Sequence, residues 1–347
     1  MDPAPSPDSS APLSAPKSTG EIHTLSVVIT IVATLSATGA AWMIMGFVLN
    51  KSLRSFRHQL VLGLAVSDLC MAINFLSSAA ANLSGNNIGL GRMKTFCSFN
   101  GFMIQTFVDQ TDYWVLCIAA CTFIMVSERK SLSNWIQTYR VVIFAIPWIL
   151  SLLWATLGLS LVGYGSIGAW CWFTSDKTRL LVNFLPRWII IALMLALYIR
   201  LYFVIHRAHK NFVSIDDGDY EMGSRFKSST TATVTATATG PSTPTTASDA
   251  PGVAPRRRAI RSKTAAPDLQ RLAYQMMLYP LVYILVWSLP TSIRIYQAVT
   301  GKSAPFTIAT IDESCIVIQG LLDAIVYGCN EKTFAGWKAA FTRKKCL

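Results

Sequence analysis

Two aspartates, Asp109 and Asp112, interrupt the otherwise almost entirely apolar stretch GFMIQTFVDQTDYWVLCIAACTFIMV at residues 101–126. On an α-helix, Gln105, Asp109 and Asp112 are spaced i, i+4 and i+7, so they share one face. Asp109 lies about 12 residues past Cys97, which is roughly 18 Å along a helix at 1.5 Å per residue. A carboxylate at that depth in a membrane must face protein or water. We therefore expect this face to point inward, with one carboxylate protonated or paired.

Three kinds of chemistry fit the two carboxylates. They form a polar joint between helices, contact a cationic or hydroxyl-rich ligand, or belong to a proton relay. No acidic ladder continues through the inner half of the segment, which argues against the relay. The joint and ligand interpretations stay open, and the joint would contact the second, fifth or seventh helix of those given below.

Four more ionisable side chains lie in apolar segments, where such groups are functional candidates by default. Arg187 and Arg294 carry guanidinium forks that suit a phosphate or carboxylate ligand. The alternative is that both arginines extend to lipid headgroups. Asp68 and Asp323 form a second pair of candidate residues.

The elements that position these residues are membrane helices. The chain is 52% hydrophobic and 14% charged, with a mean hydropathy of +0.43, whereas soluble domains average about 25% charged residues. Seven stretches have the roughly 20 apolar residues that span a bilayer: 24–49, 59–81, 97–126, 140–163, 183–205, 272–298 and 311–329. The sequence therefore predicts an all-α integral membrane bundle of seven helices.

The basic residues set the orientation of this bundle. Of the 30 Lys and Arg residues, 21 lie on one side of the membrane and six on the other. The positive-inside rule makes the richer side cytoplasmic and places the N-terminus outside. Because the net charge of +12 is concentrated in connectors, it predicts no nucleic-acid partner.

Five regions follow along the chain: a disordered outer tail at 1–23, helices one to five at 24–206, a disordered basic third cytoplasmic loop at 207–270, helices six and seven at 271–329, and an amphipathic helix with a basic tail at 330–347. The Ser/Thr-rich tract 228–251 cannot bury enough apolar surface to fold. The basic cluster RRRAIRSK at 256–263 suits membrane lipids. Its alternative role is a G-protein contact with a kinase target at Ser262.

Cys97 and Cys171 both fall on the outer, oxidising side, which favours a disulfide between them over two free thiols. The sequence predicts no cofactor and no metal site.

Three classes of seven-helix protein compete for the function. A retinal protein needs a Schiff-base lysine in the seventh helix, and residues 311–329 contain none. Transporters usually show internal repeats and interrupted helices, and no convincing repeat is visible. A receptor is favoured, with a transporter of a small solute as the alternative.

Four segments resemble the cAMP receptor-like G protein-coupled receptors: WCWF at 170–173, LAVSDL at 64–69, YPLVYILVWSLP at 279–290 and QGLLDAIVYGCNE at 319–331. This group spans slime-mould chemoattractant receptors and fungal nutrient-sensing receptors, and the resemblance covers about residues 24–341. It implies a plasma-membrane receptor, not an enzyme, that detects a nutrient or cAMP-like small molecule outside. It also implies activation of a heterotrimeric G protein α subunit inside, feeding cAMP signalling, and a kinase acting on the third cytoplasmic loop.

The resemblance also implies roles for individual residues. In seven-helix receptors the positions of Asp68 and Asp323 approach each other and change with activation; the alternative is a permanently hydrated joint. The DAIVY segment at 323–327 has Ala324 where rhodopsin-like receptors have proline, so we expect no kink there. The other switch candidates are Trp287, Pro290 and Tyr327. The candidates for G-protein coupling are Glu128, Arg129, Lys130, His206, Arg207, Arg261, Lys263 and Arg271.

Overall fold

The computed structural model describes the backbone of residues 18–50, 55–127, 138–227 and 254–329, together with residues 16 and 135. Within these ranges the side chains of 205, 208–227 and 254–273 are not described.

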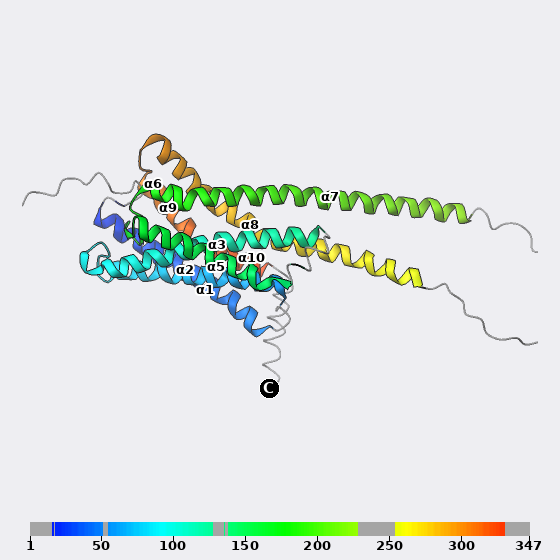
Figure 1. Ribbon diagram of the computed structural model, residues 1–347, viewed down its shortest axis with the longest axis horizontal. Coiled ribbons are helices and arrows are strands. Elements are labelled where there is room, and N and C mark those ends of the chain that lie inside the picture. Colours follow the sequence, from blue (N-terminus) through cyan, green and yellow to red (C-terminus); the bar gives the residue numbers. More distant parts are fainter. Residues whose placement is uncertain are drawn as a thin grey trace, which may run out of the picture.

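The described chain is a helical bundle (Figure 1). Four crossings are single helices: α1 (Thr19–Leu49), α2 (Phe56–Leu83), α3 (Lys94–Val126) and α5 (Arg140–Leu161). The fifth is made of α6 (Asp176–Arg179), a π-helical turn at Leu180–Phe184 and α7 (Leu185–Lys227). The sixth is α8 (Ala254–Thr300), and the seventh consists of α9 (Phe306–Val317) and α10 (Gln319–Gly328). The predicted all-α seven-helix fold is confirmed.

Five of the described helices are long and apolar enough by themselves to cross a membrane. The other two crossings, the third and the seventh, do not meet this criterion of length and apolar composition, each for a different reason. Helix α3 has 33 residues, but its buried face includes Asn100, Gln105, Asp109, Gln110 and Asp112. The seventh crossing is interrupted at Ile318, which leaves pieces of 12 and 10 residues.

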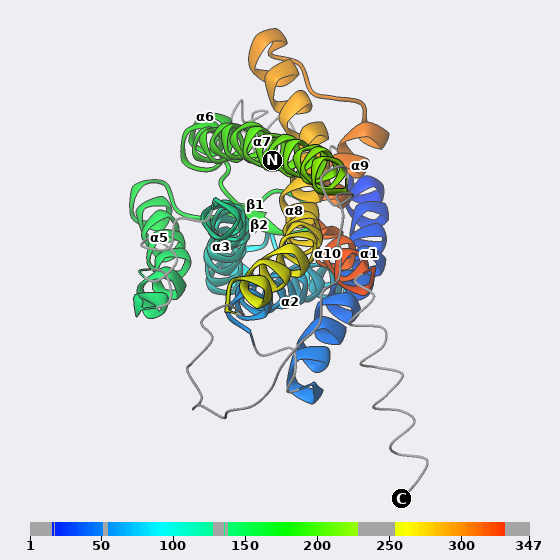
Figure 2. The ribbon, with the colours of Figure 1, turned by 90° about the vertical axis from the view of Figure 1, so that its right-hand side faces the viewer.

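Helix α3 lies at the centre of the bundle and packs against α2, α5, α7 and α8 (Figure 2). Helix α1 covers the opposite side of α2 and contacts α9 and α10. A carboxylate on α3 therefore has protein on most sides, which explains how the chain retains Asp109 and Asp112 inside an apolar segment.

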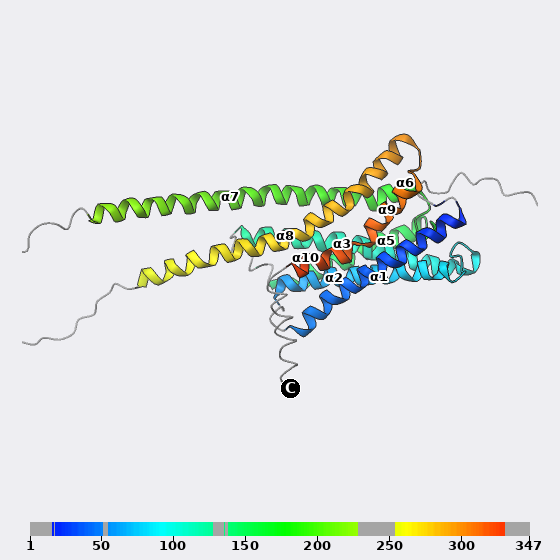
Figure 3. The same ribbon diagram turned by 180° about the vertical axis from the view of Figure 1, so that it is seen from behind.

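Some helix ends differ from the sequence prediction. Helix α1 begins at Thr19 rather than 24, because Ser18 and Glu21 form a capping box. Helices α7 and α8 project beyond the rest of the bundle, reaching Lys227 and starting at Ala254 (Figures 1 and 3). Both helices extend past the limits of 207 and 270 that the sequence predicted for the third cytoplasmic loop, because hydropathy marks where the lipid ends and not where a helix ends. Residues 228–253, and the amphipathic helix predicted after 330, lie outside the described residues.

A short loop structure covers the outer mouth of the bundle. Strands β1 (Gly165–Ser166) and β2 (Cys171–Trp172) pair antiparallel, with Ser166 opposite Cys171. The predicted bridge between Cys97 and Cys171 is present and ties β2 to the start of α3. The Tyr164 hydroxyl donates a 2.8 Å hydrogen bond to the carbonyl of Ala155, and burial raises its pKa, so this donor stays neutral.

Candidate functional site

The predicted polar face of α3 points into the bundle. Gln105, Asp109 and Asp112 are 0%, 5% and 3% exposed. Nε2 of Gln105 donates a 2.7 Å hydrogen bond to Oδ2 of Asp109. The three side chains thus lie along one buried line, as the i, i+4, i+7 spacing predicts.

Asp112 is paired with Arg187 of α7. Nε of Arg187 lies 3.2 Å from Oδ1 and 3.0 Å from Oδ2 of Asp112, and its Nη2 lies 2.9 Å from Oδ2. The Tyr283 hydroxyl of α8 donates a 2.6 Å hydrogen bond to Oδ1 of the same carboxylate. Arg187 is 0% exposed, so its extension to lipid headgroups is excluded. Asp112 thus contacts the fifth and sixth crossings, whereas the sequence predicts a contact with the second, fifth or seventh helix.

Asn183 connects the two aspartates. Its Nδ2 donates a 3.1 Å hydrogen bond to Oδ1 of Asp109, and its Oδ1 accepts a 2.7 Å bond from Nη1 of Arg187. Asn183 lies in the π-helical turn that precedes α7, and such turns are frequent at functional sites. The sequence interpretation missed Asn183, although it stands four residues before Arg187 and so shares its helix face.

The outer loop contacts the same site. Nε1 of Trp172, on β2, donates a 2.6 Å hydrogen bond to Oε1 of Gln105. A loop that covers the mouth of the bundle is thereby hydrogen-bonded to the polar face of α3.

The site continues toward helix seven through Trp287. The guanidinium carbon of Arg187 lies 3.4 Å from the centroid of the Trp287 ring, a cation–π contact. Nε1 of Trp287 donates a 3.2 Å hydrogen bond to Oε1 of Gln319, the first residue of α10. Trp287 thus joins the charged pair to the point where the seventh crossing is interrupted.

Two of the remaining switch candidates, Asp323 and Tyr327, lie on α10. Asp323 is 1% exposed and lies against the carboxyl group of Asp68 on α2, which is also buried. Tyr327 is 5% exposed and packs edge-on against Trp42 at 5.5 Å between ring centroids. Pro290 is a buried residue within α8.

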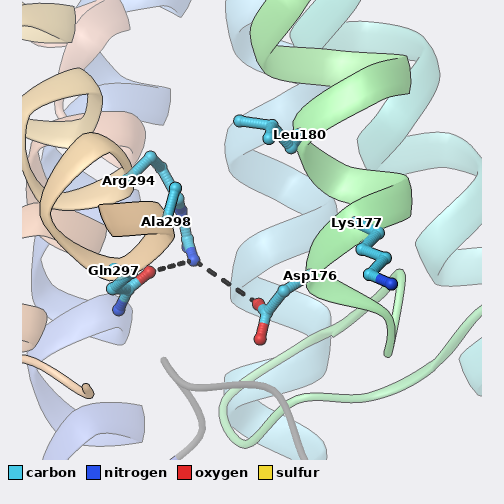
Figure 4. Close-up of a pocket in the computed structure, with 6 residues that line it drawn as sticks. All are labelled: Asp176, Lys177, Leu180, Arg294, Gln297 and Ala298. Carbon is cyan, nitrogen blue, oxygen red and sulfur yellow. Dashed lines mark hydrogen bonds and ion pairs between the residues drawn. The ribbon is translucent and has the colours of Figure 1, made fainter. Parts of the chain in front are cut away.

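Arg294 belongs to a separate, outer cluster. Its Nη1 donates a 2.7 Å hydrogen bond to Oε1 of Gln297 and lies 3.8 Å from Oδ1 of Asp176 (Figure 4). Nη2 of Arg179 lies 3.5 Å from the same Asp176 oxygen. A cavity of about 210 Å³ opens here; its lining residues are Asp176, Lys177, Leu180, Arg294, Gln297 and Ala298. The candidate ligand-binding residues therefore fall into two groups, one at Asp112 and one at Arg294.

A second cavity, of about 460 Å³, lies at the inner ends of α3 and α7. Its lining residues are Phe123, Ser127, Arg200, Phe203, Val204 and Arg207. Of the predicted coupling residues, Arg207 lines this cavity and His206 is exposed beside it. Glu128, Arg129 and Lys130 lie outside the described residues, and the side chains of Arg261, Lys263 and Arg271 on α8 are not described. Within the described ranges, no cluster of three or more His, Cys, Asp or Glu side chains is arranged to hold a metal ion.

Comparison with known families places this geometry in context. A family model described as "G protein-coupled glucose receptor regulating Gpa2" matches residues 21–212, and a model of the C-terminal part of that receptor matches residues 263–338.

Individual relatives are also receptors. The chain is 40% identical to the ascaroside receptor GPR2 of Arthrobotrys oligospora, with 88% of each chain covered. It is 32% identical to the ascaroside receptor GPR3 of the same organism, over 88% of this chain and 84% of that one. The cyclic AMP receptor-like protein A of Dictyostelium discoideum is 25% identical over 56% of this chain and 49% of its own.

Squid rhodopsin has a similar fold, with a TM-score of 0.64 at 16% identity, covering 94% of this chain and 87% of that chain. The relatives are receptors and not enzymes, and the resemblance to the cAMP receptor-like group is confirmed. The buried site therefore lies in a membrane protein that belongs to the family of G protein-coupled receptors described by these two models.

Proposed function

We propose that the protein is a plasma-membrane receptor that binds an extracellular small molecule near its outer end and activates a heterotrimeric G protein at its inner end, feeding cAMP signalling. The observation that carries this proposal is the continuous line of buried polar contacts from the outer loop to helix seven. It runs through Trp172, Gln105, Asn183, Arg187, Trp287 and Gln319.

This line of contacts suits signal transfer because it joins elements that have to move relative to one another. Trp172 lies on the outer loop, Arg187 on the fifth crossing and Trp287 on the sixth. A ligand that displaces Trp172 from Gln105 would alter the hydrogen bonds of Asn183, and through it those of Arg187. Coupling of this kind requires that the ligand bind the two arrangements with different free energies.

The inner cavity supports coupling to a G protein. It is bordered by two basic residues, Arg200 and Arg207, and by Phe123 and Phe203. Phe and Arg are among the residues enriched in protein–protein interfaces. The sequence at 256–263 is also basic, and membrane lipids and a kinase acting at Ser262 are further proposed partners.

Names of relatives supply a panel of test ligands. Two relatives are called ascaroside receptors, one is called cyclic AMP receptor-like, and the matching family model is described by glucose. We propose that the ligand of this chain belongs to one of these three classes.

Nucleotide exchange on a purified Gα subunit tests the proposal. The purified receptor in lipid nanodiscs is incubated with Gα, radiolabelled GTP analogue and each compound of the panel in turn. We expect one compound to accelerate exchange by the receptor in a dose-dependent way. A matched Arg207→Gln receptor, altered only at the inner cavity, should bind the compound but show a reduced exchange rate. The proposal fails if no compound accelerates exchange on any Gα subunit tested, or if the protein transports the compound across vesicle membranes without exchange.

A further inference from the structure

The cavity beside Arg294 contains hydrogen-bond donors that have no acceptor in the described part of the chain. Arg294 and Gln297, 8% and 5% exposed, both line it. Among the described residues, neither Nε of Arg294 nor Nε2 of Gln297 has a hydrogen-bond acceptor. A buried donor without an acceptor costs free energy, so an acceptor group from outside the protein would be favoured here.

A second arginine in the same molecule, Arg187, has a much closer carboxylate partner than Arg294. Arg187 contacts both carboxylate oxygens of Asp112 at 2.9–3.2 Å, and such two-point contacts are the strong form of this pair. Arg294, by contrast, reaches its carboxylate through one nitrogen at 3.8 Å. That carboxylate belongs to Asp176, whose side chain is 36% exposed and is shared with Arg179.

The charges around the cavity are nearly balanced. Asp312 and Glu313 of α9 interact electrostatically with Arg179 and Arg294, and neither carboxylate lines the cavity. An added anion would therefore be unfavourable unless one carboxylate left. Asp176 is the carboxylate that an anion would displace, because its side chain is partly exposed, at 36%, and lies at the first position of the short helix α6.

We propose that this cavity binds the carboxylate group of a small organic acid, whose oxygens are held by Arg294 and Gln297 in place of Asp176. The exchange of one carboxylate for another keeps the charge balance unchanged. Leu180 and Ala298 form the apolar part of the wall, so the rest of the acid is an aliphatic group. The cavity of about 210 Å³ is smaller than the 300–1,000 Å³ typical of sites for drug-sized ligands, which limits the acid to a small one. This inference goes beyond the proposed function, because it assigns a second site with its own class of ligand, apart from the contacts at Arg187.

Binding to purified receptor in nanodiscs tests this site without any G protein. The probes are straight-chain monocarboxylates from acetate to decanoate, each paired with the primary amide of the same length. The readout is the dose-dependent rise in melting temperature, from which a Kd is obtained. We expect at least one acid of the series to bind while its amide, which lacks the charge, does not.

Three variants sharpen the test. Asp176→Asn removes the competing carboxylate, so the acid should bind about threefold to tenfold more tightly, consistent with a partly exposed ion pair. Arg294→Gln removes the buried counter-charge and should weaken binding by about 30-fold or more. Arg92→Gln is the matched control, because Arg92 is exposed on the outer side beside Asn86 and away from the cavity; it should leave the Kd unchanged.

The inference is overturned if no acid binds either the wild type or Asp176→Asn, or if each acid and its amide bind equally. It is also overturned if an acid binds Asp176→Asn no more tightly than it binds the wild type, a comparison that does not depend on the folding of Arg294→Gln. An acid that binds with the expected pattern supports the carboxylate site whether or not it accelerates nucleotide exchange, because the exchange assay with the panel compounds tests the proposed function separately.

Discussion

Asp109 and Asp112 lie one helical turn apart but have different partners, and this difference decides how each tolerates mutation. Asp112 is held by the guanidinium group of Arg187 and by the hydroxyl of Tyr283. Asp109 accepts hydrogen bonds from two neutral amides, those of Gln105 and Asn183. Removing one partner of a buried ion pair leaves the other charge uncompensated, which costs much free energy. An amide donor left without its partner is neutral, so its loss costs less.

We therefore expect Asp112→Asn to destabilise the receptor by about 3–5 kcal/mol, and Asp109→Asn by about 1–2 kcal/mol. Thermal unfolding of the purified variants measures both changes. The double variant Asp112→Asn, Arg187→Gln serves as the control and should be less destabilised than the sum of its single changes. Equal effects of the two Asp→Asn changes would contradict the assignment of Arg187 to Asp112.

Signalling by the same variants separates the two interpretations of the carboxylates. If they form a joint between helices, Asp112→Asn shifts the basal rate of nucleotide exchange, and this shift does not depend on which ligand is then added. If a ligand contacts them, the dose–response curve moves to higher concentration while basal exchange is unchanged. Variants that signal like the wild type in both respects would eliminate both interpretations.

The sequence identified about half of this site. Gln105, Asp109 and Asp112 were predictable because all three stand on one helix, where spacing alone defines a shared face. Asn183, Tyr283 and Trp172 were not, because each comes from another element and only the packing brings it to the aspartates. The π-helical turn that carries Asn183 has no sequence signal that we recognised.

Close contacts between helices depend on single glycines. A Cβ atom added at Gly63 of α2 would lie 2.4 Å from the Trp114 ring of α3. Trp114 is 1% exposed and packs edge-on against Phe144 of α5, at 5.5 Å between ring centroids. The indole thus has little room to move away from a larger residue at position 63.

We expect Gly63→Ala to destabilise the receptor by about 1–3 kcal/mol through overpacking, measured as a lower melting temperature. Gly91→Ala is the control, because a Cβ atom there meets nothing within 4 Å. In a Trp114→Leu background, where the ring is gone, Gly63→Ala should cost less stability than it does in the wild type. A Gly63→Ala receptor as stable as Gly91→Ala would show that the α2–α3 contact is looser than described.

The disulfide between Cys97 and Cys171 also gives a prediction at the scale of the elements. It joins residues 74 positions apart in sequence, and removing a native disulfide costs about 2–5 kcal/mol. We expect Cys97→Ser to lower the melting temperature and to free β2, together with the Trp172 contact to Gln105. Mass spectrometry of non-reduced peptides from the wild type should show the linked pair. Recovery of both cysteines in alkylated form would contradict the bridge.

Helix seven departs from its sequence pattern. Because Ala324 stands where rhodopsin-like receptors have proline, the sequence predicted no kink at that point. The structure interrupts this crossing at Ile318, six residues earlier, where Gln319 accepts the hydrogen bond from Trp287. The interruption therefore coincides with a tertiary contact rather than with a proline. Such a contact cannot be predicted from local sequence alone.

At the scale of the whole molecule, composition was sufficient to predict the class of fold, and the counts of basic residues predicted its orientation in the membrane. Seven apolar stretches gave the number of crossings, and the disulfide between Cys97 and Cys171 agrees with an oxidising outer side. Hydropathy failed at the ends of α1, α7 and α8, because capping and helix continuation beyond the membrane do not depend on lipid.

The third cytoplasmic loop gives a prediction at the same scale. Deleting the Ser/Thr-rich tract 228–251, which lies outside the described residues, should leave membrane insertion and nucleotide exchange intact. It should slow desensitisation, because it removes sites for added phosphate charge. A reporter of cAMP over repeated ligand pulses measures this, and deletion of residues 2–15 of the outer tail is the control. Loss of nucleotide exchange in a well-expressed deletion variant would mean that coupling depends on the tract.

The length of α8 has a mechanical consequence. From Pro290 to Tyr274 the helix runs 16 residues toward the cytoplasm, which is about 24 Å at 1.5 Å per residue. Proline removes one backbone hydrogen bond and permits bending, so Pro290 acts as a fulcrum and the inner part of α8 as a lever arm. A tilt of about 10° would sweep Tyr274 through about 4 Å, calculated from the helical rise. The same tilt moves Tyr283, seven residues from the fulcrum, by about 2 Å, so a displacement there is roughly doubled where α8 leaves the membrane.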